Sequence, residues 1–184
     1  MQRIPFLRRF FRDETGVLST EAALILPLLM WAYLGLFTMF DAFRMQNINV
    51  RAAYTISDML SRETEDVTPA FLAGLNDIFA LLIRSQYPTV MRVTVVRYDE
   101  ANDDLILVWS HVDGGNGTKG PITEATMDEF DDRIPVMANA ATGIVVETWG
   151  GFVPMLNVGI DAQYFENFVV TRPRFAPQLK WADS

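Results

Sequence analysis

The sequence predicts an α+β protein, in which a long N-terminal helix leads into a domain of antiparallel sheet packed on helices. Three observations support this prediction. A run without formal charge extends from Ala22 to Phe40, behind a basic head. Apolar residues at helical spacing continue the pattern as far as Arg62. Short segments rich in β-branched and aromatic residues then recur from Met91 onward.

The basic head is predicted to be a cytoplasmic leader, residues 1–16. It carries a net charge of +2 and the rest of the chain carries −10, which together give the total net charge of −8. Basic residues in front of a membrane segment tend to stay in the cytoplasm. The basic residues are Arg3, Arg8, Arg9 and Arg12. The acidic remainder, residues 63–184, is therefore expected to form an extracytoplasmic α+β domain.

The uncharged run is predicted to cross the membrane at about residues 22–40. As a helix it spans about 28 Å, close to the roughly 30 Å of bilayer hydrocarbon. Pro27 lies inside it; such a proline costs about 3 kcal/mol in water, but neighbouring membrane helices can satisfy the freed carbonyl. One alternative is a buried core helix, which would rarely stay apolar on every face for this length. The other is a cleaved secretory signal. Its apolar stretch is usually shorter, roughly 7 to 15 residues, and a small-residue cleavage site follows it, which "FTMFDAFRMQ" lacks.

The same helix is predicted to continue outside the membrane, so that one helix covers residues 17–62. One apolar stripe at spacings of three or four supports the continuation. Its members are Met45, Ile48, Ala52, Ile56 and Met59. No glycine or proline interrupts this part of the chain before Pro69.

The remaining elements follow from local patterns. A helix is expected from Pro69 to Leu82, with Thr68 as its N-cap and Tyr87-Pro88 as its stop. Residues 91–99 and 104–112 alternate around the turn "EAND" and predict an antiparallel hairpin.

Three further elements are expected beyond the hairpin. Residues 122–134 predict a short helix in which Thr126 and Glu129 form a capping box. "TGIVVETW" predicts a third strand and "FENFVVTRPRF" a fourth. Pro173 confines the end of that fourth strand to a sheet edge, because proline cannot donate to a central ladder.

The segment "TGVLSTEAALILP", residues 15–27, carries a family resemblance. It resembles the N-terminal signature of TadE-like proteins, the minor pilins or pseudopilins of the Tad (tight adherence, Flp-type) pilus. The spacing of Gly16 and Glu21 also resembles a type IV prepilin cleavage site. The resemblance implies that a membrane-embedded prepilin peptidase cuts between Gly16 and Val17, so that Glu21 becomes the fifth mature residue. Pro27 matches a proline of the family's apolar segment.

Two downstream segments add to this resemblance. Trp149–Pro154 resembles the place where a strand of these proteins leads into an aromatic turn ending in proline. Arg172–Arg174 resembles their closing Arg-Pro-Arg.

The resemblance implies a structural subunit for Tad pilus assembly and surface adhesion, not an enzyme. It implies a single-pass protein of the cytoplasmic (inner) membrane, with its C-terminal domain in the periplasm. The implied partners are the prepilin peptidase, other Tad pilins or pseudopilins, the inner-membrane assembly platform and membrane lipid. It implies no cofactor and no metal. The alternative is an uncleaved membrane-anchored periplasmic domain for binding or sensing.

The chemistry of the junction is consistent with these roles. Gly16 has no Cβ, so it can adopt the extended shape that a peptidase needs at little steric cost. Glu21 costs a few kcal/mol in the apolar phase unless it is paired. The amine freed at Val17 of a neighbouring subunit is a fitting partner, so the charge favours docking between subunits. The simpler interpretation is a glutamate that only marks the membrane interface.

Other motifs carry less weight. The net charge of −8 argues against nucleic-acid binding, since phosphate contacts need clustered Lys and Arg. "GNGTKG" has the letter pattern of a dinucleotide fingerprint, but it lies between strands that are predicted to be antiparallel, so we interpret it as an exposed loop.

Ser110 and His111 are adjacent on a predicted strand and therefore point to opposite faces. The large aromatics, Trp109, Trp149, Phe152 and Trp181, are expected to be core residues rather than an adhesive surface.

Overall fold

The computed structural model describes residues 15–115, 117, 119–130, 133–156 and 158–183, with the backbone alone for residues 15–18, 128 and 129. The chain forms two compact units. The first comprises Met1–Asp41 and Pro154–Ile160, and the second comprises Ala42–Val153 and Asp161–Ser184. Of the predicted basic leader, all but its last two residues lie outside the described part of the chain.

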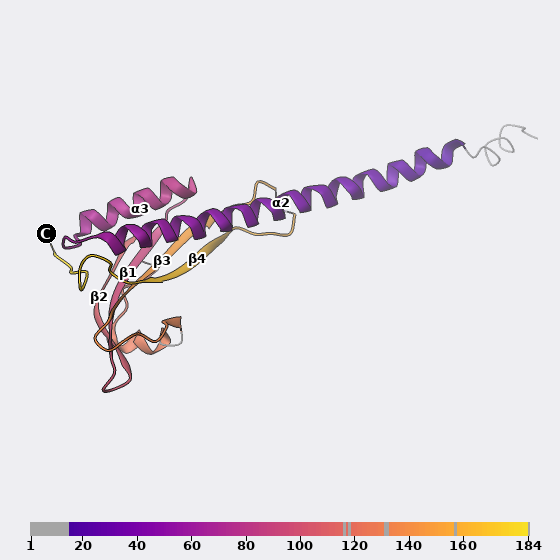
Figure 1. Ribbon diagram of the computed structural model, residues 1–184. Helices are drawn as coiled ribbons and strands as arrows, with labels where there is room; N and C mark the ends of the chain where they lie inside the picture. Colours follow the sequence, from indigo (N-terminus) through magenta and orange to yellow (C-terminus); the bar gives the residue numbers. More distant parts are fainter. Residues whose placement is uncertain (1–14, 116, 118, 131–132, 157, 184) are drawn as a thin grey trace, which may run out of the picture. The chain divides into compact units, whose positions relative to one another are not determined.

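The long N-terminal helix is confirmed. Helix α2 extends over Thr15–Arg62 among the described residues, which includes the whole predicted range, and it ends where predicted (Figure 1). Pro27 lies inside α2, and the helix continues through it. Residues of α2 up to Asp41 belong to the first unit, and those from Ala42 belong to the second.

The second unit contains a four-stranded sheet, which confirms the α+β class. The strand order is β2-β1-β3-β4, and every neighbouring pair is antiparallel. The hairpin predicted from the sequence is present. The elements of this unit besides α2 are α3 (Pro69–Ile83), β1 (Val90–Asp99), β2 (Asp104–Gly114), a 3₁₀ helix η1 (Glu124–Glu129), β3 (Thr142–Phe152) and β4 (Gln163–Thr171).

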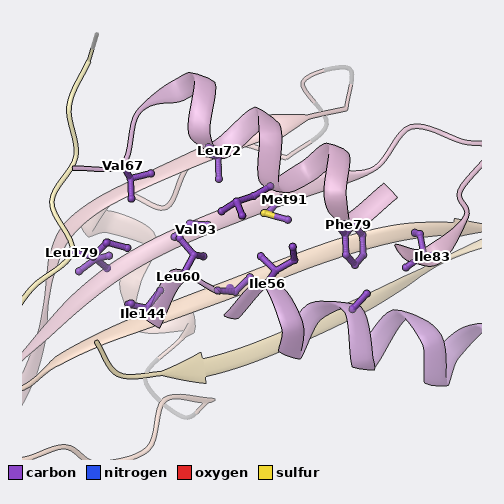
Figure 2. Close-up of a cluster of buried hydrophobic side chains, with 14 residues drawn as sticks. Ile56, Leu60, Val67, Leu72, Phe79, Ile83, Met91, Val93, Ile144 and Leu179 are labelled. Carbon is purple, nitrogen blue, oxygen red and sulfur yellow. The ribbon is translucent and has the colours of Figure 1, made fainter. Parts of the chain in front are cut away.

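One face of the sheet packs against α3 and the second half of α2 to form the main hydrophobic core (Figure 2). Ile56 and Leu60 of α2 and Phe79 of α3 are fully buried there. Met91 and Ile144 complete the contact from β1 and β3. Burying a side chain of this size stabilises the fold by about 1.5–3 kcal/mol, so this face holds the unit together.

The buried face of α2 differs in part from the predicted apolar stripe. Ala52 and Ile56 are buried as predicted, but Met59 is 37 % exposed and Leu60 takes its place in the core. The true face also contains buried polar residues, and these interrupt the apolar pattern. They are Asn49, Ser57 and Ser61.

The N-cap of α3 is confirmed, whereas its predicted stop is wrong. Thr68 Oγ1 accepts the N–H of Phe71 at 3.2 Å. The helix ends because Arg84 adopts the left-handed conformation, with φ of 51°. The Ser85 N–H then donates to the Ala80 carbonyl at 2.9 Å, which satisfies a terminal carbonyl before Tyr87 is reached.

The opposite face of the sheet is covered by the segment around η1, where the predicted helix over 122–134 is wrong. The helical part is a single six-residue 3₁₀ helix. Its N-cap residue is Thr123 rather than the predicted Thr126, and the Thr123 N–H donates to Thr126 Oγ1 at 3.1 Å. Ile122 and Met127 are both buried but five residues apart, a spacing that one α-helical face does not provide.

The turn expected at Trp149–Pro154 begins later than predicted. Strand β3 continues through the two glycines to Phe152 and pairs with β4 over that whole length. A Cβ on Gly150 would collide with the side-chain oxygen of Asn49 and lie 2.8 Å from Ile83 Cδ1. The glycine therefore allows the two helices to approach the sheet closely.

The Arg-Pro-Arg segment lies at the end of α2. Strand β4 is an edge strand that ends at Thr171, before Pro173, as the proline predicts. The Arg174 N–H donates to the Ser61 carbonyl at 2.8 Å, and its guanidinium lies 3.4 Å from Asp58. This segment thus satisfies a carbonyl at the C-terminal end of α2.

Replacing Gly150 by alanine is expected to destabilise the protein by about 1–3 kcal/mol, because the added methyl group overpacks the contact with Asn49 and Ile83. Gly74→Ala is the matched control: its Cβ meets nothing within 4 Å, and alanine favours the helix by up to about 1 kcal/mol. Guanidinium unfolding of the full chain in detergent, followed by tryptophan fluorescence, measures both. Equal stabilities of Gly150→Ala and wild type would contradict this packing.

Candidate functional site

The first half of α2 presents large apolar side chains to its surroundings. Leu24 is 78 % exposed, and Trp31 and Phe40 are exposed as well. Among the described residues, α2 is the one helix long and apolar enough to cross a membrane. Soluble proteins rarely leave so much contiguous apolar surface in water. The exposed residues include Leu26, Leu28, Leu29, Met30, Tyr33, Leu36, Phe37 and Met39.

Glu21 lies at the N-terminal end of this apolar surface. Its side chain is exposed, and within the part of the chain that the structure describes it forms no ion pair. Ile25 and Leu28 follow at i+4 and i+7 on the same helical face. The arrangement places one carboxylate at the head of an apolar stripe.

The Gly16–Val17 bond lies within helix α2, so the extended backbone expected there is not what this structure contains. A peptidase that needs an extended bond would have to unwind the helix at this point.

Pro27 changes the hydrogen bonding of the apolar segment without ending it. Proline has no N–H, so the carbonyl of Ala23, four residues earlier, lacks its usual donor. Glu21, the free Ala23 carbonyl and Pro27 lie within two turns of the helix. The N-terminal part of the apolar segment thus carries two acceptors, a carboxylate and a carbonyl.

Ser110 and His111 form no catalytic pair, as their positions on one strand predicted. Ser110 Oγ lies 2.8 Å from Thr94 Oγ1 and accepts the Ile122 N–H at 2.9 Å on the η1 side of the sheet. His111 instead stacks on Trp181, with ring centroids 3.4 Å apart and an interplanar angle of 10°.

The large aromatic residues are mainly structural, as predicted. Trp149 and Phe152 are buried. Trp109 and Trp181 are partly buried and pack against the main core. The indole N–H of Trp109 donates to the Leu179 carbonyl at 2.9 Å, which fixes the C-terminal segment on the sheet.

A buried ion pair, which the sequence patterns did not reveal, lies on the η1 side of the sheet. Arg92 donates to both carboxylate oxygens of Glu147, at 2.6 and 2.8 Å, and Glu147 is only 1 % exposed. The guanidinium also donates to the Gly120 carbonyl and lies over the rings of Phe130 and Trp149. Each guanidinium nitrogen donates a hydrogen bond and both carboxylate oxygens accept one, so we interpret the pair as structural. A glutamate in the middle of the apolar strand "IVVETW" was the available signal.

Beside this pair lies a cavity of about 460 Å³, which sequence reasoning also missed. The Lys119 ammonium lies 4.8 Å from the centroid of the Trp149 ring, and the Trp149 indole N–H donates to Glu166 at 3.1 Å. Its volume is within the range of small-molecule sites. The lining residues are Pro88, Val90, Gly115, Lys119, Trp149, Tyr164 and Glu166.

The structure does not support nucleotide binding at Gly115–Gly120. The fingerprint requires a parallel βαβ unit, whereas every strand pair among the described residues is antiparallel. Across the same part of the chain, no three His, Asp or Glu side chains are grouped as a metal site requires.

Comparisons of the chain with protein-family models, with curated proteins and with solved structures returned no match. The resemblance to TadE-like proteins therefore depends on the residues of the junction, Thr15–Pro27, and on the two downstream segments.

His111 is expected to make stability depend on pH. Burial lowers the pKa of His111 below its ordinary value of 6.5, while Asp183 acts weakly in the opposite direction. The folded state therefore binds its proton less readily than the unfolded state. Stability from this group is present above pH 6.5 and decreases as the pH falls from there toward the folded-state pKa.

The His111→Phe variant retains a ring against Trp181 but removes the titration. We expect the wild type to lose more unfolding free energy than this variant between about pH 7 and about pH 5. Guanidinium unfolding at each pH gives both values. The same loss in both proteins would show that His111 is not the responsible group.

Proposed function

We propose that this protein is a minor pilin or pseudopilin-type structural subunit of a Tad pilus, which supports pilus assembly and surface adhesion. The observation that carries the proposal is the junction in the N-terminal part of α2, where the placing of Gly16, Glu21 and Pro27 resembles the TadE-like signature. In this function the protein is a substrate of the prepilin peptidase, not an enzyme.

The exposed apolar half of α2 supports a location of this segment in the membrane. Residues 22–40 carry no formal charge, and most of their side chains are exposed around the helix. We propose that this segment anchors the protein in the cytoplasmic membrane, with residues 1–16 in the cytoplasm and residues 63–184 in the periplasm. The four arginines of the leader set this orientation under the positive-inside rule.

Glu21 supports a role in an assembly rather than in an isolated anchor. An unpaired carboxylate in the apolar phase is unfavourable by a few kcal/mol. Cleavage after Gly16 creates an ammonium group at Val17, and this cation on a neighbouring subunit can pair with Glu21. The penalty is then relieved only when two subunits meet, which favours docking into the pilus or its initiation complex.

Pro27 adds a second reason for helix packing. The Ala23 carbonyl lacks an intrahelical donor, and lipid hydrocarbon offers none. A donor from a neighbouring pilin helix satisfies it. The proposed partners are therefore other Tad pilins or pseudopilins and the inner-membrane assembly platform.

The outer domain is suited to a structural role. The main core joins α2 to the sheet through Ala52, Ile56 and Leu60, so the anchor helix and the domain share one element. We propose that this is a pilin-like arrangement, in which the second half of α2 is the spine of the domain.

The alternative, an uncleaved membrane-anchored binding or sensing domain, is favoured by the cavity of about 460 Å³ beside Trp149. This alternative requires that the full-length chain persist, so the state of the N-terminus distinguishes the two functions.

Processing after Gly16 is the first expected outcome. Membranes from cells with an active prepilin peptidase should contain a chain that begins at Val17, and membranes from peptidase-deficient cells should contain the chain from Met1. N-terminal mass spectrometry measures both. Intact Met1 chains in both membranes would overturn the processing step and favour the uncleaved domain.

The second expected outcome concerns docking. Glu21→Ala should leave cleavage largely intact but reduce pilus assembly severely, because the mature amine loses its partner carboxylate. Glu65→Ala removes an exposed carboxylate beyond the end of α2 and serves as the matched control. Counting pili by electron microscopy and following cleavage by immunoblot separate the two effects. Normal piliation of Glu21→Ala cells would contradict the docking role.

A further inference from the structure

A second segment of the first compact unit shares the apolar character of the anchor helix. The connection between β3 and β4 contains Pro154–Ile160, which we name the β3–β4 loop. This loop belongs to the same compact unit as the helix up to Asp41, not to the unit that contains the sheet. Its sequence, PMLNVGI, has no charged residue, and Asp161 follows it directly.

The loop lies against the C-terminal end of the apolar run of α2. Among the described residues from Ser19 to Phe40, Thr38 alone is buried, at 3 % exposed. Its hydroxyl donates to the Leu34 carbonyl at 3.0 Å, so it does not need water. Of the residues that the structure describes in this unit, those outside the helix belong to the β3–β4 loop, which passes beside α2 in Figure 1. We therefore attribute the burial of Thr38 to the loop.

The position of this contact along the helix axis coincides with the end of the apolar run. Thr38 lies three residues before Asp41, the first charge after the apolar run, and therefore about 4–5 Å from it along the axis. Asp161 likewise marks the end of the uncharged loop. In a membrane-spanning α2 this is the level at which hydrocarbon gives way to headgroups.

The loop directs its large apolar side chains outward at this level. Met155 is 83 % exposed and Leu156 is 38 % exposed. The Val158 N–H donates to the Leu156 carbonyl at 3.1 Å, and Gly159 has φ of 104°, a left-handed conformation that glycine adopts readily. A loop that presents adjacent apolar side chains suits the boundary between headgroups and hydrocarbon.

We infer that the β3–β4 loop is a second membrane-contacting element, which inserts Met155 and Leu156 into the surface of the phospholipid bilayer beside α2. This inference rests on the membrane-spanning helix of the proposed function. Lipid is the expected occupant because the loop continues the apolar surface of the anchor at the same depth. The loop then fixes the level of α2 in the bilayer with a contact that the helix does not supply.

Fluorescent labelling of single cysteines tests this inference, since the natural chain has no cysteine. The full chain is reconstituted in phosphatidylcholine vesicles with an environment-sensitive probe at Met155→Cys. Val136→Cys is the matched control, because Val136 is also a large apolar residue, 86 % exposed, but lies in the other compact unit. Leu29→Cys reports on the anchor helix itself.

The inference predicts that spin-labelled lipid quenches the probe at position 155 but not at 136, and that aqueous iodide quenches the probe at 136 several-fold more strongly than at 155. If lipid quenches the probe at position 29 but iodide quenches the probe at 155 as readily as at 136, the loop inference is overturned, while the membrane-spanning helix of the proposed function is supported. If lipid fails to quench position 29, the membrane-spanning helix and the loop inference both fail. Protection of position 155 only at high protein-to-lipid ratio would identify a second copy as the occupant and overturn the inference.

Discussion

The burial of one face of α2 against the sheet is the interaction on which the rest of the domain depends. Ile56 and Leu60 lie in the same core as Phe79 of α3 and Met91 of β1, so the loss of this face would expose the whole cluster. The close approach at Gly150 and the Arg174 contact with the end of α2 both serve this packing. The second half of α2 is therefore part of the core of the domain, and it also connects the domain to the apolar N-terminal half of the helix.

Under the proposed function, the same helix must also suit two different solvents, lipid and water. From Ala22 to Phe40 its side chains are almost all apolar, and all but Thr38 are exposed or half-exposed, whereas from Asn49 onward one face is buried and polar groups lie on the others. The two patterns follow one another within one continuous helix, because helical backbone satisfies nearly all of its own hydrogen bonds in lipid and in water alike. This explains why a single helix can serve as anchor and core element, while a strand cannot.

The elements that local chemistry determines could be predicted from the sequence. The N-cap at Thr68, the hairpin of β1 and β2, and the edge position forced by Pro173 are of this kind. The helix predicted over residues 122–134 was wrong because the positions of its apolar residues are set by packing against the sheet that they cover, not by a helical period. The Arg92–Glu147 pair and the cavity beside Trp149 join residues far apart in sequence, so no local spacing could indicate them.

The segment after β4 has a consequence for the order of folding. Leu179 is buried in the main core, and the backbone of Lys180 and Ala182 pairs with Val67 in the connection between α2 and α3. A part of the chain near residue 180 thus completes a core that begins at residue 52. If the domain is exported from its N-terminal end, the core cannot close until Leu179 has crossed the membrane. Until then the growing domain must remain open, and a chaperone outside the membrane would find its apolar face accessible.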